Sequence, residues 1–326
     1  MTAPAEKWRN GGEAQTAADA GPIIGRSPAI VRAVALARRF AETGLPILLV
    51  GATGTGKELF AQCIHEWSGC SGPFVDVNCG ALPKEMVESL LFGHRRGAFT
   101  GAVEGVEGLV MAADHGTLFF DELSSLPAEA QVKLLRVLET GEVRRVGDVT
   151  KRRVRFRVVA AVQEDLDDRV ARGDFRLDLF RRVAGVVLRL PALADRTDDP
   201  WLLTRHFARI AGLTLDPAAG AVVNAYLWPG NVGELRLAVE RAGFLSEGGS
   251  VTASAMAEAI ELGASWARTT PVPLAVTDQR RQLEGLLARH GGDVRAAALE
   301  LGIGRSTLYR WLRNGGFEPP VRGRYR

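Results

Sequence analysis

The chain has 326 residues, of which 46% are hydrophobic, which allows about two or three domains with cores of their own and excludes a globally disordered protein. No apolar run approaches the ~20 residues that span a bilayer, and the polar start lacks the apolar core of a signal peptide, so we expect a cytoplasmic protein with no membrane partner. The net charge is +3, but 278–326 alone holds ten Arg against five acidic residues, so the rest of the chain sums to 3 − 5 = −2.

The predicted elements divide the chain into five parts. Residues 1–21 are predicted to be a disordered leader, and 22–190 alternate strands with helices, as in a parallel α/β sheet. Residues 191–262 are helical and predict a small lid subdomain, with a Pro-Gly turn before a helix over 232–245. A Pro-containing linker over 263–277 then leads to a basic module over 278–326. The predicted strands are 47–50, 74–77, 117–120, 155–162 and 186–190.

The string GATGTGKE follows the first predicted strand and predicts a phosphate-binding loop before a helix. Its glycines leave bare backbone N–H groups to wrap a polyphosphate, and Lys57 neutralises the outer phosphates. The final position, usually Ser or Thr for a magnesium ion, is Glu58. The predicted ATP contacts are Gly51, Ala52, Thr53, Gly54, Thr55, Gly56, Lys57, Glu58 and Asp121.

Two carboxylates, Asp121 and Glu122, close the predicted strand 117–120. In this arrangement the first carboxylate holds the Mg²⁺ that accompanies ATP, and the second polarises a water for attack on the terminal phosphate. An isolated acidic pair more often caps a helix or a solvated turn. The upstream phosphate loop is what favours nucleotide chemistry here, with ATP and Mg²⁺ as the cofactors.

The basic module has three sets of apolar residues with helical spacing, and Gly302 lies in the break between the second and third sets. This pattern predicts a helix-turn-helix that binds DNA. A three-helix unit with a solvated basic face is the alternative. The predicted DNA contacts are Arg305, Ser306, Thr307, Tyr309, Arg310 and Arg313.

A glycine-rich segment over 93–108 contains the string GAFTGA, formed by Gly97, Ala98, Phe99, Thr100, Gly101 and Ala102. Closely spaced glycines allow a hinged loop whose backbone can be repositioned, and Phe99 would be an apolar contact exposed on it. The alternative is that Phe99 packs inward. The three cysteines form no CxxC pair and are expected to be buried free thiols.

With these motifs in place, the chain resembles the bacterial enhancer-binding proteins, the AAA+ activators of sigma-54 RNA polymerase. The resemblance runs from Ile23 to about Gly316 through IIGRSPAI, ESLLFGHRRGAFTGA, HGTLFFDEL, QVKLLRVLETGEVRRVG, FRLDLFRR and WPGNV. It implies an α/β parallel-sheet ATPase domain with a helical lid, followed by a small all-α helix-turn-helix domain. Its implied partners are sigma-54 RNA polymerase and enhancer-like double-stranded DNA.

The resemblance also implies residue roles. GAFTGA would touch sigma-54, with Phe99 and Thr100 at its tip. Asn78 would hold and release Glu122 according to the nucleotide state. Arg176 and Arg182 would reach the ATP of a neighbouring subunit and stabilise charge on the transferring phosphoryl group, which implies a ring, expected to be a hexamer.

Several positions depart from the family pattern. Val162 and Gln163 stand where a Thr-Asn pair is usual, and Gly233 stands where the sensor II arginine is expected. Ala52 and Ala194 replace a common glutamate and an arginine. We expect weakened hydrolysis in an active ATPase, although Arg236, one helical turn from Gly233, could compensate.

Two alternative functions stay open at the level of sequence. The chain could be a poorly hydrolysing subunit of a mixed ring, or a DNA-bound regulator that uses ATP only to control its assembly, whereas an unfoldase or helicase loader is disfavoured by GAFTGA and the basic end. Only about 21 residues precede Ile23, so we expect no receiver domain there and regulation by expression level or a separate protein.

Overall fold

The computed structural model describes residues 22–163, 166–264 and, near the C-terminus, 287, 289–290, 293–294 and 296–297. Residues up to Ala257 form one compact unit and residues from Glu258 a second, and each is described by itself. The predicted leader, most of the predicted linker and the six predicted DNA contacts lie outside the described residues. None of the helices in the described part combines the length and apolar content of a bilayer span.

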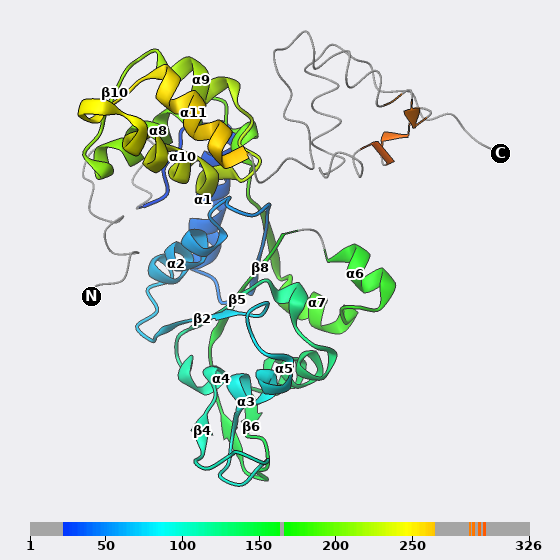
Figure 1. Cartoon of the computed structure of the whole chain (residues 1–326). Coiled ribbons are helices and arrows are strands. Elements are labelled where there is room, and N and C mark those ends of the chain that lie inside the picture. The colour runs from blue at the N-terminus through cyan, green and yellow to red at the C-terminus, as the bar shows by residue number, and fades with distance from the viewer. Residues whose placement is uncertain are drawn as a thin grey trace, which may run out of the picture. The chain divides into compact units, whose positions relative to one another are not determined.

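A five-stranded parallel sheet forms the centre of the first unit (Figure 1). The strand order is β2-β5-β8-β1-β9, and the register places Leu48 of β1 between Ala160 of β8 and Val187 of β9. The sheet confirms the predicted α/β class, and each predicted strand is present with ends shifted by at most two residues. The bounds are β1 Ile47–Val50, β2 Phe74–Asn78, β5 Thr117–Asp121, β8 Arg157–Val162 and β9 Val186–Arg189.

Alternating side chains of the strands build two separate cores, one on each face of the sheet. Ile47 and Leu49 of β1 face the cluster that contains helices α1 (Pro28–Ala41) and α2 (Lys57–Trp67). Leu48 and Val50 face the opposite cluster, which α3, α5 and α7 help to form. Because both faces are covered, the central strand β1 consists of apolar residues throughout. Each fully buried Leu or Ile contributes about 1.5–3 kcal/mol. The helices of the second face are α3 Val87–Phe92, α4 Leu109–Ala112, α5 Ala128–Thr140, α6 Asp167–Arg172 and α7 Leu177–Val183.

Four short helices and a two-stranded parallel pair follow the sheet and form the predicted helical lid. Trp228 is its largest buried side chain, and the indole N–H donates to the carbonyl of Val223 at 2.9 Å. The lid elements are α8 Asp199–Ala211, β10 Thr214–Leu215, α9 Ala219–Ala225, α10 Asn231–Leu245, β11 Ser250–Val251 and α11 Ala253–Ala264. The 3₁₀ turns of the unit are η2 Lys84–Met86, η3 Leu123–Ser125, η4 Leu193–Asp195 and η5 Glu247–Gly249.

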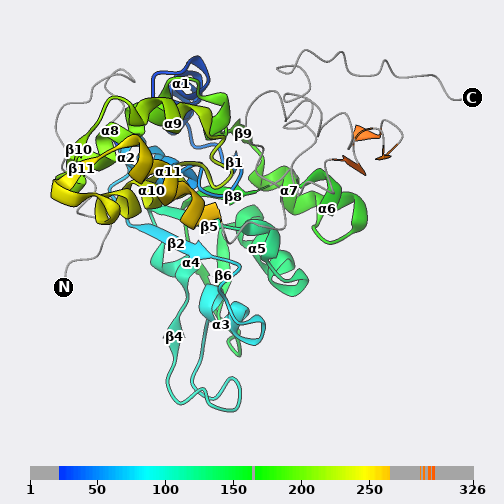
Figure 2. The ribbon, with the colours of Figure 1, turned by 45° about the horizontal axis from the view of Figure 1, so that its top comes forward.

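Two antiparallel pairs extend from the second face of the sheet. β3 (Gly93–His94) pairs with β4 (Val106–Glu107), and β6 (Glu142–Arg144) pairs with β7 (Lys151–Arg153). Figure 1 shows β4 and β6 on the same side of the fold, beyond α3, and Figure 2 shows that β4 leads into a turn that extends away from the sheet. The sequence analysis predicted none of these four strands, because each is two or three residues long.

In the second unit, beyond the end of α11, only scattered positions are described. Val294 and Ala297, two apolar positions of the predicted second helix, are buried, and the Asp293 carboxylate accepts the N–H of Ala296 at 3.2 Å. This contact is typical of a helix N-cap. It agrees with a helix beginning near Val294.

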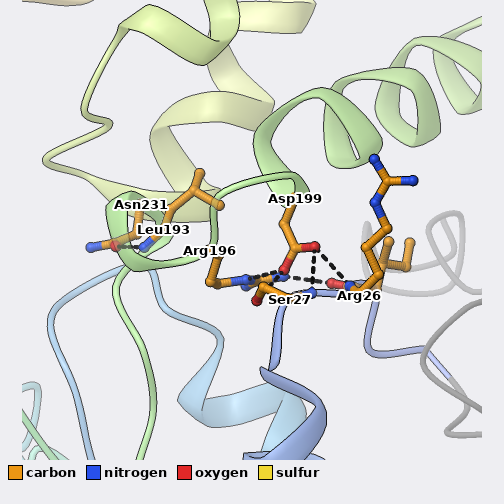
Figure 3. Close-up of polar contacts among 7 residues, drawn as sticks. Arg26, Ser27, Leu193, Arg196, Asp199 and Asn231 are labelled. Carbon is orange, nitrogen blue, oxygen red and sulfur yellow. Dashed lines mark hydrogen bonds and ion pairs between the residues drawn. The ribbon is translucent and has the colours of Figure 1, made fainter. Parts of the chain in front are cut away.

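A buried network joins the lid to the segment before α1 (Figure 3). The Asp199 carboxylate accepts backbone N–H groups of Arg26 at 2.7 Å and Ser27 at 3.2 Å, and the Ser27 hydroxyl at 3.0 Å. Arg196 donates to the same carboxylate at 2.8 Å and to the carbonyl of Ile24 at 2.6 Å. The Arg196 and Asp199 side chains are 3% and 0% exposed, so neither charge has water as an alternative partner.

Asp199→Asn should therefore destabilise the protein strongly. The amide leaves the Arg196 charge without its counter-ion in a buried site, a change that typically costs about 3–5 kcal/mol. Denaturant unfolding would measure the loss. Asp198→Asn is the matched control, because Asp198 is exposed and makes no side-chain cap, and its effect should stay within about 0.5 kcal/mol. Similar stabilities of the two variants would contradict this account.

Candidate functional site

The predicted phosphate loop lies between β1 and α2, at the carboxyl end of the sheet. Gly54 and Gly56 have φ of +77° and +95°, in the region that favours glycine, and Gly56 is the N-cap of α2. The loop therefore directs backbone N–H groups and a helix N-terminus at one point, as an anion site requires.

Lys57 lies within this loop. Its ammonium donates to the carbonyls of Gly51 at 2.8 Å and Ala52 at 3.2 Å. Burial lowers the pKa of Lys57, while the negative charges of Asp121 and Glu122 act in the opposite direction. The two motifs that the sequence analysis connected are thus electrostatically coupled in space.

The acidic pair lies at the end of β5. The backbone N–H of Glu122 donates to the carboxylate of Asp121 at 3.0 Å, and Glu122 has a φ of +51°, which turns the chain sharply after the strand. Burial raises the pKa of Glu58, with further contributions from the charges of Asp76 and Asp121. Glu58, Asp76 and Asp121 therefore form a negative region beside the loop, which suits a cation.

Among the described residues, the side chain that hydrogen-bonds the Glu122 carboxylate is that of Gln163. Its amide donates to the Glu122 carboxylate at 3.4 Å. The side-chain oxygen of Asn78, the predicted partner of Glu122, instead accepts the N–H groups of Gly80 at 2.9 Å and Ala81 at 3.0 Å. Asn78 is still close, because it lies directly beside Asp121 in the sheet register.

The lid reaches the phosphate loop through residues that the sequence analysis did not assign to the site. The Asn231 amide donates to the carbonyl of Thr53 at 2.8 Å, and the N–H of Val232 donates to the carbonyl of Gly54 at 3.0 Å. A methyl group added to Gly54 would overlap the carbonyl oxygen of Gly230. From the sequence, the WPGNV string predicts only a turn, because its contact is with a loop 178 residues away along the chain.

Gly233, in the first turn of α10, faces the phosphate loop. A Cβ added there would have Gly54 Cα as its nearest neighbour, at 3.8 Å, an ordinary van der Waals contact. The position therefore has room for a side chain. Arg236, the suggested substitute for the absent arginine, lies 3.7 Å from Glu240 in an ion pair.

The two predicted arginine fingers lie on or just before α7. Arg176 makes two hydrogen bonds to Asp178, at 3.0 and 2.7 Å, and Arg182 donates twice to the carbonyl of Leu138, at 3.1 and 2.6 Å. Both guanidinium groups thus have partners within the chain, and neither contacts the phosphate loop of the same chain.

The GAFTGA segment forms the turn between β3 and β4. The N–H of Gly97 donates to the carbonyl of Ala102 at 2.8 Å, and Gly97 and Gly101 have φ of +79° and +101°. Phe99 is 42% exposed, and its ring lies 5.0 Å from the ring of His94. Phe99 is therefore partly exposed on the turn, and its ring packs against the ring of His94.

His94 is itself fixed at the base of this turn. Its Nδ1 lies 2.7 Å from the hydroxyl of Ser89 on α3, and both residues are buried. The exposed aromatic ring of the turn thus rests on a side chain that is held by the helix connecting it to β2.

The strand order, the phosphate loop after β1, the acidic pair after β5 and the helical lid together define an AAA+ ATPase. Three family models match the chain in succession: the Sigma-54 interaction domain at 23–189, the AAA+ ATPase lid domain at 194–270, and Bacterial regulatory protein, Fis family, at 279–314.

Curated proteins and solved structures agree with these matches. The transcriptional regulatory protein GlrR of Escherichia coli (strain K12) is 40% identical over 322 residues, covering 96% of this chain and 70% of that protein. The C4-dicarboxylate transport transcriptional regulatory protein DctD of Rhizobium meliloti (strain 1021) is 42% identical over 312 residues, covering 93% of this chain and 66% of that protein. The crystal structure of NtrX from Brucella abortus in complex with ATP has a TM-score of 0.66 and 32% identity, covering 91% of this chain and 69% of that one.

The chain therefore belongs to the family of sigma-54-dependent transcriptional activators, which are ATP-binding AAA+ ATPases with a Fis-type DNA-binding module. The predicted family, its fold class and its ATPase activity are confirmed.

Gly54→Ala should weaken ATP binding at least tenfold, which corresponds to about 1.4 kcal/mol. The new methyl group would be strained at positive φ by about 1–2 kcal/mol and would displace the carbonyl of Gly230. Titration with a fluorescent ATP analogue would measure the affinity. Gly69→Ala is the control, because Gly69 also has positive φ, at +64°, but nothing lies within 4 Å of its added Cβ. Equal affinities of the two variants would argue against a role for the loop–lid contact.

Proposed function

We propose that this chain hydrolyses ATP at the boundary between neighbouring copies of a ring and uses the energy to move the GAFTGA segment against sigma-54, which converts a closed promoter complex into an open one. The observation that carries the proposal is the position of Gly80, where an added methyl group would overlap the carboxylate of Glu122. Glu122 thus lies against the chain that leaves β2, and this chain continues through η2 and α3 to the GAFTGA turn.

The phosphate loop and Lys57 would bind the triphosphate. Lys57 would exchange its bonds with loop carbonyls for bonds with the outer phosphates. Asp121 would hold Mg²⁺, and the negative charge of Glu58 and Asp76 beside it fits a divalent cation. The described residues contain no group of three or more metal-ligating side chains. Mg²⁺ bound to ATP does not need one, because phosphates and waters supply most of its ligands.

Glu122 would orient and polarise the attacking water. Among the described residues, its carboxylate accepts a hydrogen bond from Gln163. The Glu122 carboxylate and the Asn78 side-chain oxygen both lie close to Gly80. We suggest that Glu122 exchanges Gln163 for Asn78 as the nucleotide state changes. Because Asn78 begins the connection to α3, this exchange would change the position of the GAFTGA turn.

Arg176 and Arg182 would act on the ATP of the adjacent copy. Their present partners, Asp178 and the carbonyl of Leu138, would be replaced by phosphate oxygens when a ring assembles. A hexamer is the expected assembly, either of identical copies or with a second activator. In that ring Gly97, Ala98, Phe99, Thr100, Gly101 and Ala102 would face sigma-54.

DNA binding is assigned to the C-terminal module. Arg305, Ser306, Thr307, Tyr309, Arg310 and Arg313 would contact bases and phosphates of upstream DNA. The domain division proposed above, at 22–190, 191–262, 263–277 and 278–326, and the cytoplasmic location are retained as parts of this proposal.

Thr100→Ala should abolish transcription activation while leaving ATP turnover within about twofold of wild type. The reason is that Thr100 lies on the exposed turn and far along the chain from the phosphate loop. In vitro transcription and phosphate release would measure the two activities. Glu122→Gln is the paired variant, which should lose turnover and activation but keep sigma-54 binding. Full activation by Thr100→Ala, or by Glu122→Gln, would refute the proposed coupling.

Gly233→Arg should increase ATP turnover. One charged contact with phosphate is worth about 1.5–3 kcal/mol, roughly 10- to 150-fold in affinity or rate, and the position has room for the side chain. Steady-state phosphate release would measure the gain, with Gly44→Arg, in a position with nothing within 4 Å of an added Cβ, as the control. If wild-type turnover is at background and only addition of a second activator restores it, the mixed-ring alternative is favoured.

A further inference from the structure

The ribbon formed by β6, β7 and their turn, residues 142–153, is a charged surface that the nucleotide cycle does not use. Arg144 pairs with Lys151 across the ribbon, and Glu142 pairs with Arg153. These twelve residues contain five cations and two acids, so their net charge is 5 − 2 = +3, which equals that of the entire 326-residue chain. The cations are Arg144, Arg145, Lys151, Arg152 and Arg153.

The cations outnumber the local acids even after the ion pairs are counted. Lys151 contacts Glu142 at 2.7 Å, and Arg152 contacts Glu107 at 3.1 Å. Arg144 and Arg153 are both exposed and make no ion pair with any residue that the structure describes. The hydrogen bond from Lys151 lowers the pKa of Glu142, and the charges of Arg153 and Arg144 lower it further. The single acid of the strands thus lies in a positive environment.

This ribbon is fixed to the GAFTGA turn. The N–H of Arg95 donates to the carbonyl of Val146 at 3.0 Å, and the N–H of Val146 donates to the carbonyl of Gly93 at 2.8 Å. Gly147, with φ of +75°, lies so close to Ala98 that an added Cβ would be 2.9 Å from the Ala98 methyl. The β6–β7 ribbon therefore lies beside the GAFTGA turn wherever that turn makes contact.

We propose that the β6–β7 ribbon binds the phosphate backbone of the promoter DNA that sigma-54 polymerase occupies. This proposal rests on the proposed contact of the GAFTGA turn with sigma-54. The guanidinium fork suits phosphate, and a two-stranded ribbon is narrow enough for the major groove. In the proposed function the GAFTGA turn moves during the ATP cycle. Because DNA carries a negative charge about every 1.7 Å along its axis, the cations of the ribbon would meet a phosphate at each position of the turn. An acidic protein segment has no such regular spacing of charge, so it would pair with the cations at only one position of the turn.

Photocrosslinking in the full-length protein tests the contact directly. Val149 is 84% exposed in the ribbon turn and can be replaced by p-azidophenylalanine. In a complex with sigma-54 polymerase, ATP and end-labelled promoter DNA, this position should crosslink to the DNA. The same residue at Phe244, which is 94% exposed in the lid, serves as the control and should not. Crosslinks from position 149 only to sigma-54 or polymerase subunits would overturn the proposal in favour of a protein partner.

Charge neutralisation supplies a second, independent measurement. Arg144→Gln combined with Arg153→Gln should reduce activation at least fivefold at physiological salt and leave ATP turnover unchanged. It should also reduce the slope of log activation against log salt by about 1.8, or about 0.9 for each phosphate contact. Arg39→Gln combined with Arg205→Gln removes two exposed cations elsewhere and should change neither activation nor its salt slope.

Equal salt slopes for the two double variants would contradict the ribbon–DNA contact. The proposed function is tested separately by Thr100→Ala. If the proposed function is wrong, that variant will activate transcription normally, whatever the ribbon binds. A missing crosslink together with an inactive Thr100→Ala variant would reject the ribbon contact alone.

Discussion

The close approach of the phosphate loop to the start of α10 is the constraint on which the active site depends. Gly54 meets the backbone of Gly230 directly, and Asn231 closes the contact with a hydrogen bond to Thr53 at 2.8 Å. Asn231 adopts φ of +55° to do so, a strained conformation that a buried hydrogen-bonded side chain can maintain. The lid is therefore part of the nucleotide site, and its position and the loop's shape cannot change independently.

Opposing electrostatic effects act on Lys57 inside the phosphate loop. Burial lowers the pKa of Lys57, while the negative charges of Asp121 and Glu122 act in the opposite direction. Its ammonium donates to two loop carbonyls, those of Gly51 and Ala52. Gly233, which faces the loop, carries no side-chain charge. The lid therefore contacts the loop through backbone groups at this position.

The sequence predicted the elements whose signal is local. Apolar runs such as Ile47–Val50 marked the strands, and the glycines around Lys57 marked the phosphate loop. It missed contacts that depend on distant pairing. Nothing near Asp199 indicates that its partners are Ser27 and Arg26, and nothing near Gln163 indicates that it, and not Asn78, contacts Glu122 here. The short strands β3, β4, β6 and β7 were missed because two or three residues carry no periodicity.

The Asp199 network also constrains the order in which the chain can mature on the ribosome. Arg26 and its acceptor are 173 residues apart, which corresponds to roughly 10–35 s of synthesis at about 5–20 residues per second. During this interval the segment before α1 has emerged but lacks its carboxylate partner, and the cluster around Ile23 remains incomplete. Nascent copies would therefore be the natural targets of chaperones that recognise exposed apolar chain, and completion of α8 would mark the end of that vulnerability.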